Sequence, residues 1–168
     1  MGLVSLWDKK TVPQRHKEHK EIFPGFSLVG FVSLWDKKPP TMTENELATI
    51  AVDICFRIHN VLGPGLLESV YEAAFAYELD KRNIPYVRQK GIVANYEDAV
   101  LDIGFRADII MNNKLIVEIK SVEHLEKVHH KTVLTYLKLS EIKLAILVNF
   151  NVNLIKDGLH RKINGQIL

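Results

Sequence analysis

Charged residues lie among the apolar residues of one stretch of the chain, and they limit the structures that this stretch can adopt. Residues 106–120 are rich in Val, Ile and Leu but also carry Asp108, Glu118 and Lys120. The central pair at 112–113, Asn-Asn, tolerates a left-handed backbone, so the stretch predicts two antiparallel strands joined by a tight turn. Glu118 and Lys120 are two residues apart on the second strand and therefore share one of its faces.

The length of the turn decides whether Asp108 joins that face. With a two-residue loop at 112–113, Asp108 lies opposite Val117 and points away from Glu118. A three-residue loop at 112–114, or a bulge in either strand, pairs Asp108 with Glu118 and collects the three charges on one face. The residues of the turn allow either arrangement.

Two carboxylates held close together repel each other unless a cation lies between them. Oxygen ligands with open positions for water suit Mg²⁺, with Mn²⁺ as an alternative. An ammonium group beside such an ion orients or deprotonates a water molecule and stabilises the charge that develops on a phosphate. If Asp108 shares the face of Glu118 and Lys120, the hairpin therefore predicts a metal-assisted phosphodiesterase site.

Two motifs resemble those of a known family. Asp108 followed by residues 118–120 (EIK) resembles the D…ExK signature of the PD-(D/E)XK nuclease superfamily. Residues 65–71 (GLLESVY) match the signature of one of its branches, the GxxExxY proteins, and the resemblance extends from about Met42 to the C-terminus. It implies an α/β, restriction-endonuclease-like fold with a mixed β-sheet flanked by helices.

The resemblance also implies roles for individual residues. The expected catalytic residues are Glu68, Asp108, Glu118 and Lys120. The three carboxylates among them are the expected metal ligands, and the expected supporting residues are Gly65, Tyr71 and Thr132. At Thr132 the family often has a glutamine that is thought to help hold the site, so this chain departs from the pattern there.

A helix predicted from residue 64 to about residue 82 places Glu68 on a mostly apolar stripe together with Gly65 and Tyr71. One interpretation of Glu68 is a partly exposed side chain with its carboxylate in water. The other, which the resemblance favours, is that Glu68 leans over the hairpin as a further metal or water ligand, with Gly65 allowing close approach. Tyr71 is expected to pack its ring and to bond the carboxylate cluster through its hydroxyl.

The remaining pattern predicts the rest of the fold. Thr43 and Glu46 have capping-box spacing ahead of a helix that ends at Gly63. Further predicted elements are a strand at 91–96, a turn at 97–98, a helix at 125–137 and a strand at 144–150. The last strand is nearly all apolar, so it should run parallel to the Glu118 strand, with helices on both faces. The expected buried residues include Ile54, Cys55, Ile116, Ile119, Ile146 and Val148.

Residues 1–41 differ from the rest of the chain. The sequence LVSLWDKK at 3–10 recurs as FVSLWDKK at 31–38, and the segment between them is basic and without period. We expect an irregular, disordered extension outside a nuclease-like domain at 42–168; the alternative is a basic arm that contacts nucleic acid or a partner. The extension holds 7 Lys and Arg against 4 Asp and Glu, which leaves 15 against 16 in the domain. Affinity for nucleic acid must then come from a local cluster and the metal.

The single cysteine, Cys55, cannot form an internal disulfide, and no apolar run approaches the roughly 18 residues that a bilayer requires. A cytoplasmic location away from membranes is therefore expected. The leading functional prediction is a Mg²⁺-dependent nuclease that hydrolyses phosphodiester bonds of nucleic acid, with DNA as the expected substrate. The alternative is a catalytically inactive nuclease-fold module that binds nucleic acid or protein, which Thr132 and the non-basic domain favour. No feature predicts the oligomeric state.

Overall fold

The computed structural model describes residues 42–167, apart from the side chains of residues 95, 96 and 101–103. The predicted extension at 1–41 lies outside the described residues, so the domain boundary stays a prediction. No helix in the described part of the chain has both the length and the apolar character needed to span a bilayer. The elements in chain order are α1 (Glu44–Leu62), α2 (Glu68–Lys81), β1 (Tyr86–Tyr96), β2 (Ala99–Met111), β3 (Leu115–Lys120), α3 (Lys127–Ser140), β4 (Leu144–Asn149), α4 (Ile155–Gly158) and β5 (Leu159–Ile163).

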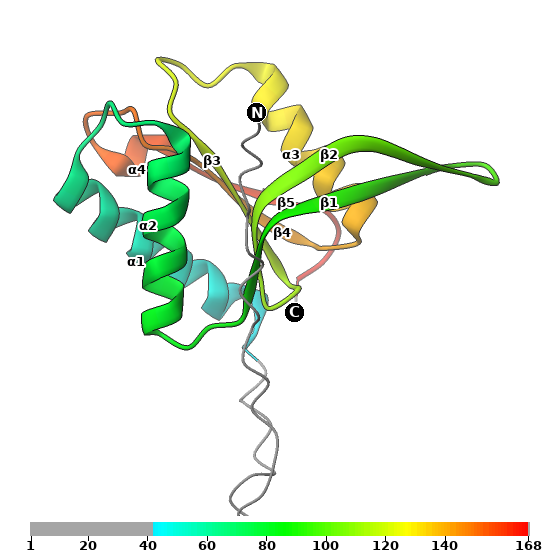
Figure 1. Cartoon of the computed structure of the whole chain (residues 1–168), viewed down its shortest axis with the longest axis horizontal. Coiled ribbons are helices and arrows are strands. Elements are labelled where there is room, and N and C mark those ends of the chain that lie inside the picture. The colour runs from blue at the N-terminus through cyan, green and yellow to red at the C-terminus, as the bar shows by residue number, and fades with distance from the viewer. Residues whose placement is uncertain (1–41, 168) are drawn as a thin grey trace, which may run out of the picture. The chain divides into compact units, whose positions relative to one another are not determined.

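The five strands form one mixed sheet in the order β1-β2-β3-β4-β5 (Figure 1). Neighbouring strands are antiparallel except β3 and β4, which are parallel and connected through α3. The register of that parallel pair places Glu118 beside Leu147. The predicted βαβ unit and the predicted mixed sheet flanked by helices are both confirmed.

Helices cover both faces of the sheet. Residues of α1 and α2 share one buried cluster with Val117 and Ile119, whereas residues of α3 share a second cluster with Ile110 and Ile116. Figure 1 accordingly shows α3 across the sheet from α1 and α2. Because both faces are covered, all six residues of β4 are buried. The six residues that we predicted to be buried are each no more than 3% exposed: Ile54, Cys55, Ile116, Ile119, Ile146 and Val148.

The first helix begins and ends where the sequence predicts. The Thr43 hydroxyl accepts a hydrogen bond from the Glu46 N–H at 3.2 Å, and the Glu46 carboxylate accepts one from the Thr43 N–H at 2.7 Å. This reciprocal pair is the predicted capping box. At the other end Gly63 adopts a φ of 69° and donates its N–H to the His59 carbonyl at 2.9 Å, which ends α1.

The second helix begins at Glu68, later than the predicted start at 64–65. Gly65 has a φ of 93°, a backbone conformation that an α-helix does not contain. Gly65 therefore belongs to the connection between α1 and α2, and its placement on a helical stripe was wrong. Glu68 becomes the first residue of α2, where the helix dipole stabilises a negative charge.

Strands β1 and β2 form a long ribbon that projects from the sheet (Figure 1). The predicted turn at 97–98 is confirmed, with Glu97 at a φ of 51°. However, β1 begins at Tyr86 and not at residue 91. The residues at 88–90 are Arg, Gln and Lys, which lack the apolar alternation that marks a strand, and this explains why the sequence pattern missed the start of β1.

Candidate active site

The turn between β2 and β3 contains three residues, one of the two lengths that the sequence allowed. Met111 pairs with Leu115 across the strands, and the Lys114 N–H donates to the Met111 carbonyl at 2.9 Å. Asn112 and Asn113 both adopt left-handed conformations, with φ of 47° and 53°. This register brings Asp108 onto the same face as Glu118 and Lys120.

Asp108 is held between two strands by both of its carboxylate oxygens. Its Oδ2 accepts the backbone N–H of Ile119 at 2.8 Å, and its Oδ1 accepts the side-chain amide of Gln89 at 3.1 Å. The β2–β3 pairing ends at Ile109 and Val117, so the Asp108 side chain takes the place of the next backbone acceptor for β3. Burial raises the pKa of Asp108, although the hydrogen bond from Ile119 acts in the opposite direction.

Glu118 is almost completely buried, with 4% of its surface exposed. Its Oε1 accepts a hydrogen bond from Lys120 Nζ at 2.8 Å, whereas its Oε2 is a buried oxygen with no hydrogen-bond partner. Burial and then the nearby charge of Asp108 raise the pKa of Glu118 to about 7. Oε2 of this carboxylate is therefore free to bind a metal ion, and a positive charge nearby would stabilise the ionised form.

The Lys120 ammonium group lies between the two carboxylates. Its Nζ is 2.8 Å from Glu118 Oε1 and 3.9 Å from Asp108 Oδ2, and it also donates to the carbonyl of Ile119 at 2.9 Å. Burial by itself lowers the pKa of Lys120, but the charge and hydrogen bond of Glu118 outweigh that effect and raise it. Lys120 is therefore positively charged at neutral pH.

Glu68 reaches the end of β3 from the start of α2. Its Oε1 accepts the backbone N–H of Ser121 at 3.1 Å, and the Ser121 hydroxyl donates to the Leu66 carbonyl at 2.6 Å. Its charge contributes to the raised pKa of Lys120. Across residues 42–167, however, no group of three or more His, Cys, Asp or Glu side chains is arranged to hold a metal ion. The role of Glu68 as a third metal ligand therefore stays a prediction.

Tyr71 does not bond the carboxylate cluster, and that prediction was wrong. Its hydroxyl donates to the Gly63 carbonyl at 2.7 Å and accepts the Leu66 N–H at 3.1 Å. Its ring stacks on Phe150 with centroids 4.3 Å apart and planes at 7°. Tyr71 therefore stabilises the 63–66 connection, which includes Gly65 and leads into Glu68.

Thr132 lies half-buried on α3, one helical turn before Tyr136. The hydroxyl of Tyr136 is close enough to the cluster that, after burial, the charge of Glu118 raises its pKa. The sequence analysis predicted the helix at 125–137 that contains Tyr136 but gave this residue no role in the site. Its position one turn after Thr132 is the signal that could have linked it to the site.

The sequence interpretation also missed a polar group beside Asp108. Glu72 on α2 is only 7% exposed, and its two oxygens accept hydrogen bonds at 2.7 Å from Arg88 Nε and Gln89 Nε2. Gln89 connects this group to Asp108. A glutamate on the buried side of α2 followed by a polar start to β1 was the available signal, since a buried carboxylate requires partners.

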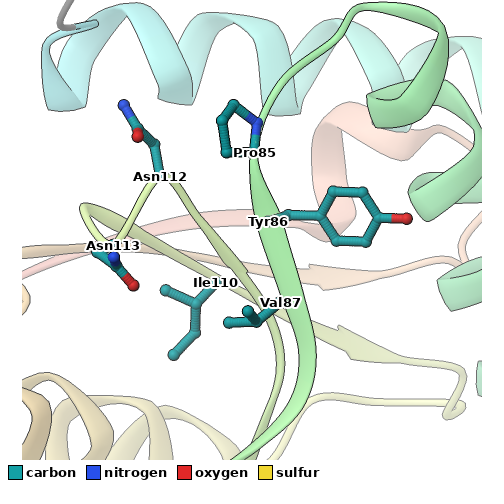
Figure 2. A pocket seen from close by; sticks show the side chains of 6 residues that line it. All are labelled: Pro85, Tyr86, Val87, Ile110, Asn112 and Asn113. Atoms are coloured by element: carbon teal, nitrogen blue, oxygen red, sulfur yellow. The ribbon is translucent and has the colours of Figure 1, made fainter. Parts of the chain in front are cut away.

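A separate cavity of about 110 Å³ lies at the turn of the hairpin (Figure 2). It is lined by Pro85, Tyr86, Val87, Ile110, Asn112 and Asn113. This lining contains no carboxylate and no basic side chain, so it offers neither a charged ligand for a metal ion nor a cation for a phosphate. The chemistry of the residues therefore places the candidate site at Asp108, Glu118 and Lys120.

The donor set fits a hard divalent cation. Asp108 and Glu118 supply carboxylate oxygens on one face, and Glu118 Oε2 is buried without a partner. Burial raises both pKa values, and the charge of Asp108 adds to the rise at Glu118 while the charge of Glu72 adds to the rise at Asp108. A bound cation would relieve this repulsion. A mixed sheet that carries such carboxylates beside a lysine is the arrangement of a nuclease-like domain.

Comparison with known families agrees with this class. The family model of the PD-(D/E)XK nuclease superfamily matches residues 45–162, and the chain belongs to that superfamily. No curated protein and no solved structure is significantly similar to the chain. Members of this superfamily usually use divalent metal ions and act on nucleic acid.

Proposed function

We propose that this protein is a Mg²⁺-dependent nuclease that hydrolyses phosphodiester bonds of DNA, with Mn²⁺ as an alternative ion. The observation that carries the proposal is the convergence of Asp108, Glu118 and Lys120 on one face, with Glu118 Oε2 left without a partner. We also infer that the chain belongs to the GxxExxY branch. Support comes from Gly65 and Tyr71, which shape and hold the connection that leads into Glu68.

Asp108 and Glu118 would hold the metal ion in this mechanism. When bound, Mg²⁺ would neutralise charge on the scissile phosphate and lower the pKa of a water molecule. Glu68 would support the site from the first turn of α2, where its carboxylate already contacts the end of β3 at Ser121. The hydrogen bond from Ile119 fixes the orientation of Asp108 before any ion arrives.

Lys120 would position the attacking water and stabilise the phosphate. Because Lys120 stays protonated at neutral pH, it acts as a hydrogen-bond donor and a positive charge and not as a base. The water oxygen forms a bond to phosphorus while the bond to the leaving oxygen breaks; the proton that the water loses passes to solvent, and the leaving oxygen takes a proton from solvent. The fixed position of the ammonium group, held by Glu118 and the Ile119 carbonyl, keeps the cost of reorganisation low.

A second candidate is a catalytically inactive nuclease-fold module that binds nucleic acid or protein. The position of Lys120 favours it, because the ammonium group already compensates Glu118 and lies near Asp108. Thr132, where relatives often carry glutamine, favours it as well. In either case a cytoplasmic location remains a prediction, supported by the free, buried thiol of Cys55.

A titration with Mg²⁺ and Mn²⁺, followed by a panel of single- and double-stranded DNA and RNA substrates, separates the two candidates. The nuclease proposal expects saturable binding of a divalent ion and ion-dependent cleavage of DNA, both lost in Glu118→Gln. Glu123→Gln is the matched control, because Glu123 has a side chain 89% exposed and lies just beyond β3. Wild-type protein that binds nucleic acid but no divalent ion would support the inactive module and refute the nuclease.

A further inference from the structure

Gln89 has an unusual backbone for its place in the sheet. It lies within β1, between Arg88, which pairs with Ile109, and Lys90, which pairs with Ala107. Its φ is 49°, in the left-handed region that residues other than glycine rarely adopt. Because a strand normally has an extended backbone, this conformation is costly and must be held by the surrounding structure.

Hydrogen bonds of the Gln89 side chain hold this backbone conformation in place. Its Nε2 donates to Glu72 Oε2 at 2.7 Å and to Asp108 Oδ1 at 3.1 Å. The other oxygen of Glu72 accepts Arg88 Nε at 2.7 Å. Both oxygens of this buried glutamate are therefore occupied, which makes Glu72 a fixed anchor for the Gln89 amide.

We propose that Gln89 is a positioning residue that orients Asp108 for metal binding, anchored by Glu72 on α2; the metal-binding part of this inference rests on the proposed function. The Gln89 amide holds Oδ1 of Asp108 from β1, and the Ile119 N–H holds Oδ2 from β3. The carboxylate is thus fixed from both sides. The same helix presents Glu68 at its first turn, so α2 contributes to both parts of the site.

The chemistry of an amide suits this place. A primary amide has two N–H donors and no charge, so one group can bond two carboxylates. A lysine or arginine there would neutralise Asp108 and reduce its attraction for a cation. Gln89 orients Asp108 and leaves its negative charge available to a metal ion.

Two substitutions separate this role from a purely structural one. Gln89→Gly relieves the left-handed backbone but leaves Glu72 Oε2 without its donor. These two effects oppose each other, so the unfolding temperature should change little. The affinity of this variant for Mg²⁺, measured by calorimetry, should nevertheless fall about tenfold or more. Gln89→Asn keeps a residue that tolerates this backbone but shortens the side chain by one methylene, and it should show the same loss. Lys90→Ala, at the next and exposed position, is the control.

A double-mutant cycle tests the anchor. If Glu72 acts through Gln89, Glu72→Gln should weaken Mg²⁺ binding in the wild-type background and have little further effect in Gln89→Gly. Additive losses would show that Glu72 acts independently and would overturn its assignment as the anchor.

A measurement on metal-free protein keeps this inference distinct from the proposed function. The amide proton of Ile119 reports its hydrogen bond to Asp108 Oδ2. In Gln89→Gly and Gln89→Asn its chemical shift should move and its exchange with solvent should speed up, whereas Lys90→Ala should leave both unchanged. If wild-type protein binds no divalent ion, the nuclease proposal is refuted. The Ile119 amide would still test whether Gln89 orients Asp108. An unchanged Ile119 amide in both Gln89 variants would overturn the positioning role.

Discussion

Lys120 Nζ lies 2.8 Å from Glu118 Oε1, although the other oxygen of the same carboxylate, Oε2, is buried and has no hydrogen-bond partner. The ion pair therefore satisfies only half of a carboxyl group that is 4% exposed. Burial of this carboxylate and then the charge of Asp108 keep the pKa of Glu118 raised despite a lysine in contact with it. This imbalance gives the site a measurable dependence on pH.

We expect the stability of the metal-free protein to fall as pH rises from about 5 to 7. Burial and the charge of Asp108 raise the pKa of Glu118 from 4.5 to about 7, so the folded protein binds a proton that the unfolded chain has released. The stabilisation is complete below the unfolded pKa and is lost as pH rises through the folded one, at a cost on the order of 3 kcal/mol. Urea unfolding across this range measures it. Glu118→Gln should flatten the profile; an equally steep fall in that variant would assign the effect to another group.

Asp108→Asn and Asp108→Ala should differ in stability but not in metal binding. Either change removes a charged ligand, so Mg²⁺ binding should be lost in both. Repulsion between carboxylates alone predicts that both variants are at least as stable as wild type. The Ala variant, however, leaves the Ile119 N–H without its acceptor, which costs roughly 1–3 kcal/mol, whereas Asn keeps an oxygen there. Calorimetry and chemical unfolding test the two parts, with the exposed Asp157→Ala as control.

Lys120→Ala should retain the metal ion and lose turnover. The ammonium group competes with a cation for the two carboxylates, so its removal should leave Mg²⁺ affinity unchanged or higher. Its proposed contribution to orientation and charge stabilisation predicts a decrease in kcat of about 10²–10⁴-fold. Loss of Mg²⁺ binding together with activity would instead mean that Lys120 maintains the fold of the site. The exposed Lys127→Ala is a suitable control.

Tyr71→Phe should destabilise the protein by about 1–3 kcal/mol. The substitution keeps the ring that stacks on Phe150 but leaves the Gly63 carbonyl and the Leu66 N–H without their shared partner. Tyr77→Phe is the matched control on the same helix, since Tyr77 is 63% exposed, and its effect should stay within about 0.5 kcal/mol. Equal losses of stability in the two variants would refute the structural role that we assign to the Tyr71 hydroxyl.

The sequence predicted those parts of the fold that short-range patterns determine. Thr43 and Glu46 carry a capping box that is complete within four residues, and the apolar run of β4 requires burial on both faces. The choice of turn length was different, because Asn112 and Asn113 tolerate a left-handed backbone in either loop. Only the pairing of whole strands decides that Asp108 shares a face with Glu118.

The missed residues of the site depend on contacts between distant parts of the chain. Gln89 reaches Glu72 on a preceding helix and Asp108 on the next strand, and no local periodicity marks such a bridge. For Gly65 the local pattern was misleading: its spacing predicted a position on a helix, but its positive φ is incompatible with an α-helix. In both cases the backbone conformation, which side-chain patterns do not specify, decides the role of the residue.

The three-residue turn at 112–114 affects how this protein can change over evolutionary time. Insertion or deletion of one residue would turn the side chains of one strand of the hairpin to the opposite face relative to the other strand. Asp108 and Glu118 would then lie on opposite faces although neither residue had changed. Substitutions that tolerate the same backbone would leave the pairing intact. Functional descendants of this sequence are therefore expected to vary in the amino acids of this turn but to keep its length of three residues.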